Sequence, residues 1–287
     1  MNARVVTLVQ GSAAWHEHRA KYRNASETPA VLGVSPWTTP YQLWMQRTGR
    51  ATVEVNAAMA HGTANEPAAR AMFETLTGHV MQPLVMVDGD YSASLDGITL
   101  DGSFIVEIKC PASKDSSILK DARAGRVPVA VYWQMQTQMM VSGATLGQLY
   151  VFDGKVGVLL DQPAEPAAWE TIRKGWDEFM SYVATDTPPP LTDRDTVVRD
   201  DPVWASAAGE YLRLKAAAET ASEALDAAKA RLVGLARHTS ERGAGVAVSR
   251  FWKTGAVQYA RVPELAGVDL EKYRGARREE VRVTVSR

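Results

Sequence analysis

The stretches Ser94-Leu95-Asp96-Gly97 and Val106-Glu107-Ile108-Lys109 decide the fold of this chain. Asp101-Gly102 lies between them and is typical of the turn of a β-hairpin. Because side chains alternate along a strand, Glu107 and Lys109 share one face and Ile108 points to the other. Asp96 lies on the preceding strand and reaches the same face as Glu107. The sequence therefore predicts a hairpin on which two acids and a lysine converge.

This hairpin fits two chemical roles. Converging carboxylates can hold a hard divalent cation through oxygen, and a neighbouring lysine can steady a water or a phosphate. That is the equipment of metal-dependent phosphodiester hydrolysis. Asp-Gly turns and Glu-x-Lys strands also occur in ordinary soluble proteins, where they form a solvated hairpin with a cross-strand ion pair. Other segments of the chain bear on the choice.

The composition is that of an ordinary globular protein. The chain has 287 residues, enough for one large or two modest domains. Its net charge of −1 gives no global basic field, so a nuclease would place its positive charge locally. The one cysteine, Cys110, excludes an internal disulfide framework and is interpreted as a small apolar strand residue. Without a membrane-spanning apolar run or a secretory signal, we expect a soluble intracellular protein with no membrane contact.

Hydrophobic periodicity predicts alternating strands and helices. Two helices are expected to begin at the capping residues Ser12 and Ser26. Further helices are expected over residues 41–47, 55–77, 117–124, 129–142 and 165–184, and strands over 5–9, 81–87, 91–95, 103–109, 148–152 and 156–160. This order predicts an α/β fold in which helices flank a mixed central sheet.

The chain changes character after Pro188-Pro189-Pro190, which marks a linker. We therefore predict a domain of residues 1–187, a proline-rich linker of 188–200 and a C-terminal extension of 201–287. The extension carries a heptad stripe of Tyr211, Leu214, Ala218, Ala221, Leu225, Ala228, Leu232 and Leu235. A long helix that packs within its own chain is the preferred interpretation, and a coiled-coil dimer is the alternative.

After the heptad stripe we expect a second hairpin, with strands over 246–252 and 257–262. Its Arg250, Trp252, Lys253 and Arg261 interleave basic and aromatic residues, which suits contact with a DNA strand by charge and stacking. A small packed domain with an ordinary surface explains the same pattern. The last residues, from Lys272 on, are basic.

Two helical segments could complete the site on the first hairpin. Glu66 opens or enters a helix, where it either stabilises the first turn or adds a third acid to a metal site, directly or through water. Gln134 and Gln138 share one helix face, while Gln136 lies elsewhere. Buried amides need partners, and a water or a phosphate oxygen would serve. The alternative is a polar stripe at the surface.

A third segment near the start suits an anion. Arg19 together with a helix-capping Ser26 would bind a terminal phosphate, because a guanidinium and helix amides stabilise that oxyanion. His16 and His18 are two residues apart and do not share a helix face, so zinc is not predicted here.

Taken in order, these motifs resemble the YqaJ-type viral recombinase family, which is phage lambda exonuclease-like and belongs to the PD-(D/E)xK nuclease superfamily. The series consists of Trp15, Arg19, Ala25-Ser26-Glu27, Gly62, Asn65-Glu66, Ser94-Leu95-Asp96-Gly97, Glu107-Ile108-Lys109-Cys110-Pro111 and Tyr132-Trp133-Gln134-Met135-Gln136. The resemblance covers residues 5–185. The chain departs from the family at Leu95, where a proline is usual, and we expect little loss because that proline sets only backbone shape.

The resemblance implies a restriction-endonuclease-like core and Mg²⁺-dependent 5′-to-3′ digestion of linear double-stranded DNA, with Mn²⁺ as a substitute metal. The implied catalytic residues are Glu66, Asp96, Glu107, Lys109 and Gln134. Asp96, Glu107 and the backbone carbonyl of Ile108 resemble the metal ligands, joined by Glu66, and Lys109 resembles the lysine beside the attacking water. The implied 5′-phosphate contacts are Arg19, Ser26 and Ser94.

The resemblance also implies a role in phage-type recombination in the bacterial host cytoplasm. Its implied partners are double-stranded DNA, a single-strand annealing protein, and further copies of the chain in a homo-oligomer such as a ring-shaped trimer. Two alternatives stay open. One is an endonuclease or nickase with the same centre, since a core fold does not fix the substrate topology. The other is a DNA-binding assembly protein whose acids no longer bind metal.

Overall fold

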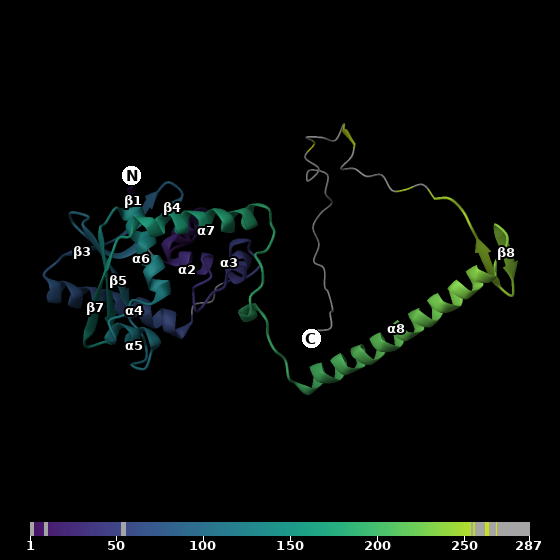
Figure 1. Ribbon diagram of the computed structural model, residues 1–287. Coiled ribbons are helices and arrows are strands. Elements are labelled where there is room, and N and C mark those ends of the chain that lie inside the picture. The colour runs from purple at the N-terminus through teal and green to yellow at the C-terminus, as the bar shows by residue number, and fades with distance from the viewer. Residues whose placement is uncertain are drawn as a thin grey trace. The chain divides into compact units, whose positions relative to one another are not determined.

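A computed structural model describes residues 3–8, 11–52 and 56–253, together with residues 255, 262, 263 and 268 (Figure 1). The chain forms two compact units, Met1–Val197 and Val198–Arg287. No helix in the described ranges is both long enough and apolar enough to cross a lipid bilayer.

Seven strands of the described chain form a mixed sheet at the centre of the first unit. They are β1 (Arg4–Val6), β2 (Arg23–Asn24), β3 (Met81–Asp88), β4 (Tyr91–Thr99), β5 (Phe104–Lys109), β6 (Leu146–Phe152) and β7 (Gly157–Pro163). The order is β1-β3-β4-β5-β6-β7, with the short β2 paired in parallel to the start of β4. β5 and β6 are also parallel, and the remaining neighbours are antiparallel. The structure thus confirms the predicted α/β fold class.

Helices lie on both sides of this sheet (Figure 1). They are α1 (Ala13–Lys21), α2 (Thr28–Val31), α3 (Pro40–Arg47), α4 (Ala57–Thr77), α5 (Ser117–Arg123), α6 (Val129–Ser142) and α7 (Pro166–Ala184), with 3-10 helices η1 (Ala25–Glu27) and η2 (Asp193–Asp195). Met135 of α6 packs in one buried cluster with Ile105 of β5. Phe73 of α4 packs in another with Val106. Because neighbouring residues of β5 face opposite sides, α4 and α6 cover opposite faces of the sheet.

The helix ends confirm one predicted cap and correct two predictions. Ser12 caps α1 by accepting a hydrogen bond from the Trp15 backbone N–H. Ser26 does not cap a helix, because it lies inside η1 and α2 begins only at Thr28. Glu66 does not open a helix either: α4 begins at Ala57, so Glu66 lies in its middle, away from the positive end of the helix dipole.

In the described part of the second unit, a long helix is followed by a hairpin. α8 (Pro202–Leu235) is continuous over 34 residues and leads to β8 (Ser240–Gly243) and β9 (Val246–Ser249) (Figure 1). This hairpin, which the sequence did not predict, turns at Ala244-Gly245, where Gly245 takes the left-handed conformation with φ +80°. The predicted strand over 257–262 falls almost wholly outside the described residues.

The heptad stripe lies along α8. Within the part of the chain that the structure describes, α8 buries none of its residues. Packing of the stripe inside its own chain stays a prediction.

Candidate functional site

The β4–β5 hairpin brings the two predicted acids together. Gly97 pairs with Val106, and the Asp101 carboxylate accepts a hydrogen bond from the Ser103 N–H in the connecting turn. The backbone N–H of Ile108 donates to Oδ2 of Asp96 at 2.7 Å. This contact fixes the Asp96 side chain against the strand that carries Glu107.

Glu107 is the most enclosed acid of the site, with 2% of its surface exposed. Its Oε1 lies 2.5 Å from Nζ of Lys109 and accepts a hydrogen bond from Nε2 of Gln134 at 2.8 Å. Its Oε2 accepts from Nε2 of Gln138 at 2.6 Å. The structure thus brings Gln134 to Glu107, together with Gln138, which shares its helix face but was not among the implied catalytic residues.

Glu66 joins the site through an arginine. Nη2 of Arg70, one turn further along α4, contacts Oε1 of Glu66 at 2.9 Å. Nε of the same arginine donates to the backbone carbonyl of Asp96 at 2.6 Å. Arg70 therefore ties α4 to the end of β4 and holds Glu66 near the other acids. Its position four residues after Glu66 is the sequence signal that could have identified it.

Burial and nearby charges shift the pKa values of three groups in the site, Asp96, Glu66 and Lys109. Burial raises the pKa of Asp96 well above its ordinary value, and the charges of Glu107 and Glu66 raise it further. Burial also raises the pKa of Glu66, although Arg70 opposes the shift. Burial alone would lower the pKa of Lys109, but the charges of Glu107 and Asp96 outweigh it and raise that pKa. Lys109 is therefore protonated at neutral pH.

The site offers the type of ligand atom that magnesium prefers, carboxylate oxygen. Mg²⁺ takes oxygen ligands and is usually held by one or two carboxylates, with waters and substrate phosphates completing the shell. Asp96 and Glu107 supply two such carboxylates, and the mutual repulsion that raises the pKa of Asp96 is what a cation would relieve. Among the described residues, no three His, Cys, Asp or Glu side chains are grouped around a common point. Glu66 pairs with Arg70 and interacts electrostatically with Asp96 and Glu107.

A polar cluster brings together the predicted phosphate contacts. Nη1 and Nη2 of Arg19 each lie 3.1 Å from Oγ of Ser26, and Nη2 contacts Glu27 at 3.0 Å. The guanidinium lies over the Trp15 ring at 4.7 Å. Nε1 of Trp15 in turn donates to Oγ of Ser94 at 3.3 Å. Arg19, Ser26 and Ser94 therefore lie in one neighbourhood, linked through Trp15.

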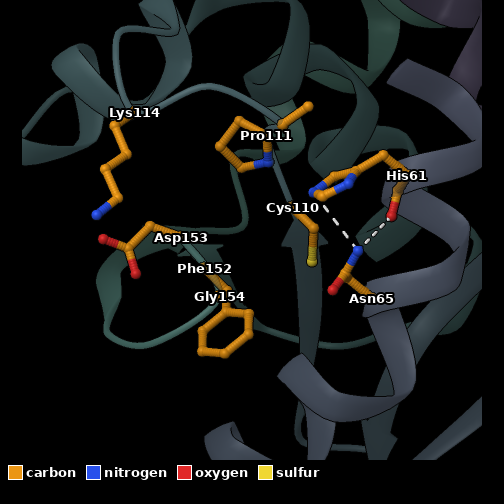
Figure 2. A pocket seen from close by; sticks show the side chains of 9 residues that line it. His61, Asn65, Cys110, Pro111, Lys114, Phe152, Asp153 and Gly154 are labelled. Carbon is orange, nitrogen blue, oxygen red and sulfur yellow. Dashed lines mark hydrogen bonds between the residues drawn. The ribbon is translucent and has the colours of Figure 1, made fainter. Parts of the chain in front are cut away.

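A pocket of about 120 Å³ lies on the α4 side of the sheet. Figure 2 shows His61 and Asn65 on α4 facing Cys110 at the end of β5, with Asp153 and Lys114 at the far side. Burial raises the pKa of Cys110 to about 11, with the charges of Glu66 and Asp96 adding to the shift. The thiol is therefore protonated at neutral pH, in keeping with a small apolar strand residue.

The structure describes three of the four predicted DNA contacts of the extension. Nη2 of Arg250 donates to the carbonyls of Val233 and Ala236, so its guanidinium closes the C-terminal end of α8. Trp252 and Lys253 are exposed. Arg261 lies outside the described residues.

Comparison with solved structures defines the class of the fold. The alkaline exonuclease LHK-Exo from Laribacter hongkongensis aligns with a TM-score of 0.53 and 22% identity, over 72% of this chain and 98% of that chain. LHK-Exo in complex with dAMP aligns with a TM-score of 0.53 and 24% identity, over 61% of this chain and 94% of that one. Over the aligned residues, this chain shares the fold of LHK-Exo.

Sequence comparison finds a family resemblance over part of the chain. Residues 14–145 match the model of the YqaJ-like viral recombinase domain. The uncharacterized protein YqaJ of Bacillus subtilis (strain 168) is 23% identical over 222 residues. The match covers 74% of this chain and 66% of YqaJ, slightly under two thirds of the relative's length. The resemblance that the motifs indicated is confirmed.

Proposed function

We propose that the chain is a Mg²⁺-dependent deoxyribonuclease that digests linear double-stranded DNA from 5′ to 3′ in phage-type recombination. The observation that carries the proposal is the assembly of Asp96, Glu107, Lys109 and Gln134 at one end of the β4–β5 hairpin. The exonuclease fold and the YqaJ-like domain support it. The similar exonuclease LHK-Exo has been solved in complex with dAMP, which supports release of nucleoside monophosphates.

The residues of the site divide the reaction between them. Asp96, Glu107 and the Ile108 carbonyl would hold the metal, with Glu66 acting through water. When bound there, Mg²⁺ supplies a Lewis acid for the phosphate and lowers the pKa of the attacking water. Lys109, kept protonated by its acidic neighbours, orients that water and offsets the negative charge that develops on the phosphate. Gln134 keeps the Glu107 carboxylate in place by its hydrogen bond to Oε1.

The polar cluster around Arg19 supports the proposed direction of digestion. Water attacks phosphorus, the bond from phosphorus to the 3′-oxygen breaks, and that oxygen takes up a proton. The released nucleotide carries the original 5′-phosphate, and the shortened strand carries a new one. Each cut thus regenerates the group that Arg19, Ser26 and Ser94 would bind, since a guanidinium suits a terminal phosphate.

The proposal includes partners outside this chain. A recombination nuclease exposes single strands, so a single-strand annealing protein is the expected partner in the bacterial host cytoplasm. Further copies of the chain, arranged as a ring around the duplex, would keep the enzyme on its substrate.

The test is digestion of three substrates in Mg²⁺ by the purified full-length chain. They are a linear duplex with 5′-phosphates, the same duplex with 5′-hydroxyls, and a covalently closed circle of the same sequence. We expect loss of the phosphorylated linear duplex to mononucleotides and an intact circle. Cutting of the circle would establish an endonuclease or nickase. No hydrolysis in Mg²⁺ or Mn²⁺, with DNA still bound, would establish an assembly protein without catalysis.

A further inference from the structure

Helix α6 carries two completely buried glutamines, Gln136 and Gln138, whose side chains contact different parts of the structure. Nε2 of Gln136 donates to the Pro163 carbonyl, and its Oε1 accepts from the Glu165 N–H and from Trp169 Nε1. Gln136 therefore fastens α6 to the segment between β7 and α7. Gln138 has the same exposure, 0%, but its amide nitrogen points at the acids of the site.

Gln138 connects the Glu107 carboxylate to the strand that carries Ser94. Its Nε2 donates to Oε2 of Glu107 at 2.6 Å and lies 3.4 Å from the backbone carbonyl of Ser94. Gln134 and Lys109 hold Oε1 of the same carboxylate. Both oxygens of Glu107 are thus fixed, and the carboxylate cannot rotate without breaking one of these contacts.

Stability alone does not explain Gln138. Its Oε1 is buried and has no hydrogen-bond partner among the described residues. A buried acceptor left without a donor costs about 1–3 kcal/mol, whereas an apolar side chain of the same shape would avoid that loss. Residues that break a local rule of stability are concentrated at functional sites.

We propose that Gln138 is a positioning residue that sets the orientation of the Glu107 carboxylate and couples it to the backbone at Ser94. This inference rests on the proposed function, since it takes Glu107 as a metal ligand. Partners that orient a metal ligand typically contribute about 10–100-fold to metal affinity or activity.

The test compares Gln138→Met with Gln136→Met, two substitutions of equal size and burial on one helix. Thermal unfolding of the free chain, Mn²⁺ binding measured without DNA, and kcat and KM on 5′-phosphorylated duplex are the readouts. Gln138→Met should weaken Mn²⁺ binding and lower kcat, each about 10–100-fold, with KM and the unfolding temperature unchanged. Gln136→Met should lower the unfolding temperature, because it removes three hydrogen bonds, and leave kcat and Mn²⁺ affinity unchanged.

Two results would overturn the assignment while leaving the nuclease proposal intact. One is an active Gln138→Met enzyme with wild-type Mn²⁺ affinity. The other is an equal loss of kcat in both variants, which would show a general effect of repacking α6. A wild-type chain that neither binds Mn²⁺ nor hydrolyses DNA would instead overturn the nuclease proposal, and Gln138 with it.

The exposed stripe of α8 carries an independent inference. Leu225 and Leu235 are each 68% exposed on a helix that buries none of its residues within the described chain. Ala218, Leu225 and Leu232 occupy one heptad position, and Leu214, Ala221, Ala228 and Leu235 the other. A spacing of 3.5 residues maintained in this way is that of a helix that supercoils with another helix.

The charged residues beside the stripe favour a parallel over an antiparallel pair of α8 helices from two copies of the chain. In a parallel pair, Glu210 precedes the stripe at the position that faces Lys215 of the second copy, and each copy gains an attractive contact. The antiparallel register that aligns the whole stripe would set Lys215 beside Lys229 of the second copy, twice. We infer that α8 pairs in parallel with α8 of a second copy.

Cysteine cross-linking of the full-length chain tests this pairing. Cys110 is buried and has a pKa of about 11, so introduced cysteines dominate the chemistry. Under mild oxidation, Ala221→Cys should give a covalent dimer, because this stripe position faces its own counterpart only in a parallel pair. Ala230→Cys, on the outer face, should give none. Absence of the dimer with Ala221→Cys, or equal yields from both variants, would overturn the inference.

Discussion

Replacing Lys109 with methionine should lower kcat about 10²–10³-fold while DNA ends still bind. Nζ of Lys109 lies 2.5 Å from Oε1 of Glu107 and interacts with Asp96, whose pKa burial and the charges of Glu107 and Glu66 raise. Methionine keeps most of the apolar stem and removes the ammonium group. The expected loss corresponds to about 2.7–4 kcal/mol of transition-state stabilisation. Glu107 keeps Gln134 and Gln138 as donors, so we expect the fold to persist.

The assay is single-turnover digestion of 5′-phosphorylated duplex, with DNA affinity measured separately in Ca²⁺. Lys174→Met is the matched control, because Lys174 lies exposed on α7 and pairs only along its own helix with Glu170 in the described structure. The control should digest DNA at the wild-type rate. A Lys109→Met enzyme that does the same would refute the role of Lys109, and a variant that loses DNA affinity in proportion to its rate would assign Lys109 to binding.

Three further substitutions test other parts of the site and fold. Arg19→Gln should raise KM for 5′-phosphorylated ends about 10–100-fold, the value of charged hydrogen bonds worth ~1.5–3 kcal/mol, and spare 5′-hydroxyl ends; equal effects on both ends would contradict the phosphate contact. Asp96→Asn should abolish hydrolysis and raise the unfolding temperature at pH 8 more than at pH 4. Because the pKa of Asp96 is raised above 3.8 in the fold, this acid destabilises the fold increasingly as pH rises through that value, and asparagine does not ionise; a pH-independent difference would count against the shift. Gly97→Ala should lower the free energy of unfolding in urea by about 1–3 kcal/mol, since its Cβ would lie 2.7 Å from Cβ of Met81; an unchanged midpoint would show that this packing is loose.

The parts of the fold that sequence predicted are those that local chemistry determines. The β4–β5 hairpin follows from alternation and from Asp101-Gly102, where Gly102 has φ +70° and the carboxylate closes the turn. The placement of Gln134 and Gln138 on one face of α6 follows from helical spacing alone. Both features needed only neighbours within a few residues.

The errors came where contacts outside the local capping pattern decide the outcome. Ser26 has the chemistry of a helix cap, but Arg19 takes its hydroxyl and the chain forms η1 instead. Glu66 suits the start of a helix, but Asn56 caps α4 ten residues earlier and Arg70 becomes its partner. The burial of Gln138 against Glu107 depends on how α6 lies across β5, and no spacing in the sequence contains that information.

The contacts of Arg19 would reduce the conformational entropy that the protein loses when it binds a DNA end. Its guanidinium is anchored by Ser26 and Glu27, and Glu27 also pairs with Arg47, whose guanidinium lies 5.3 Å from the buried Trp176 ring. A free arginine side chain would forfeit about 2 kcal/mol of rotamer entropy on meeting a ligand. Here folding has already removed that freedom, so a DNA terminus would meet a rigid receptor, and its capture would depend little on temperature-driven ordering of the protein.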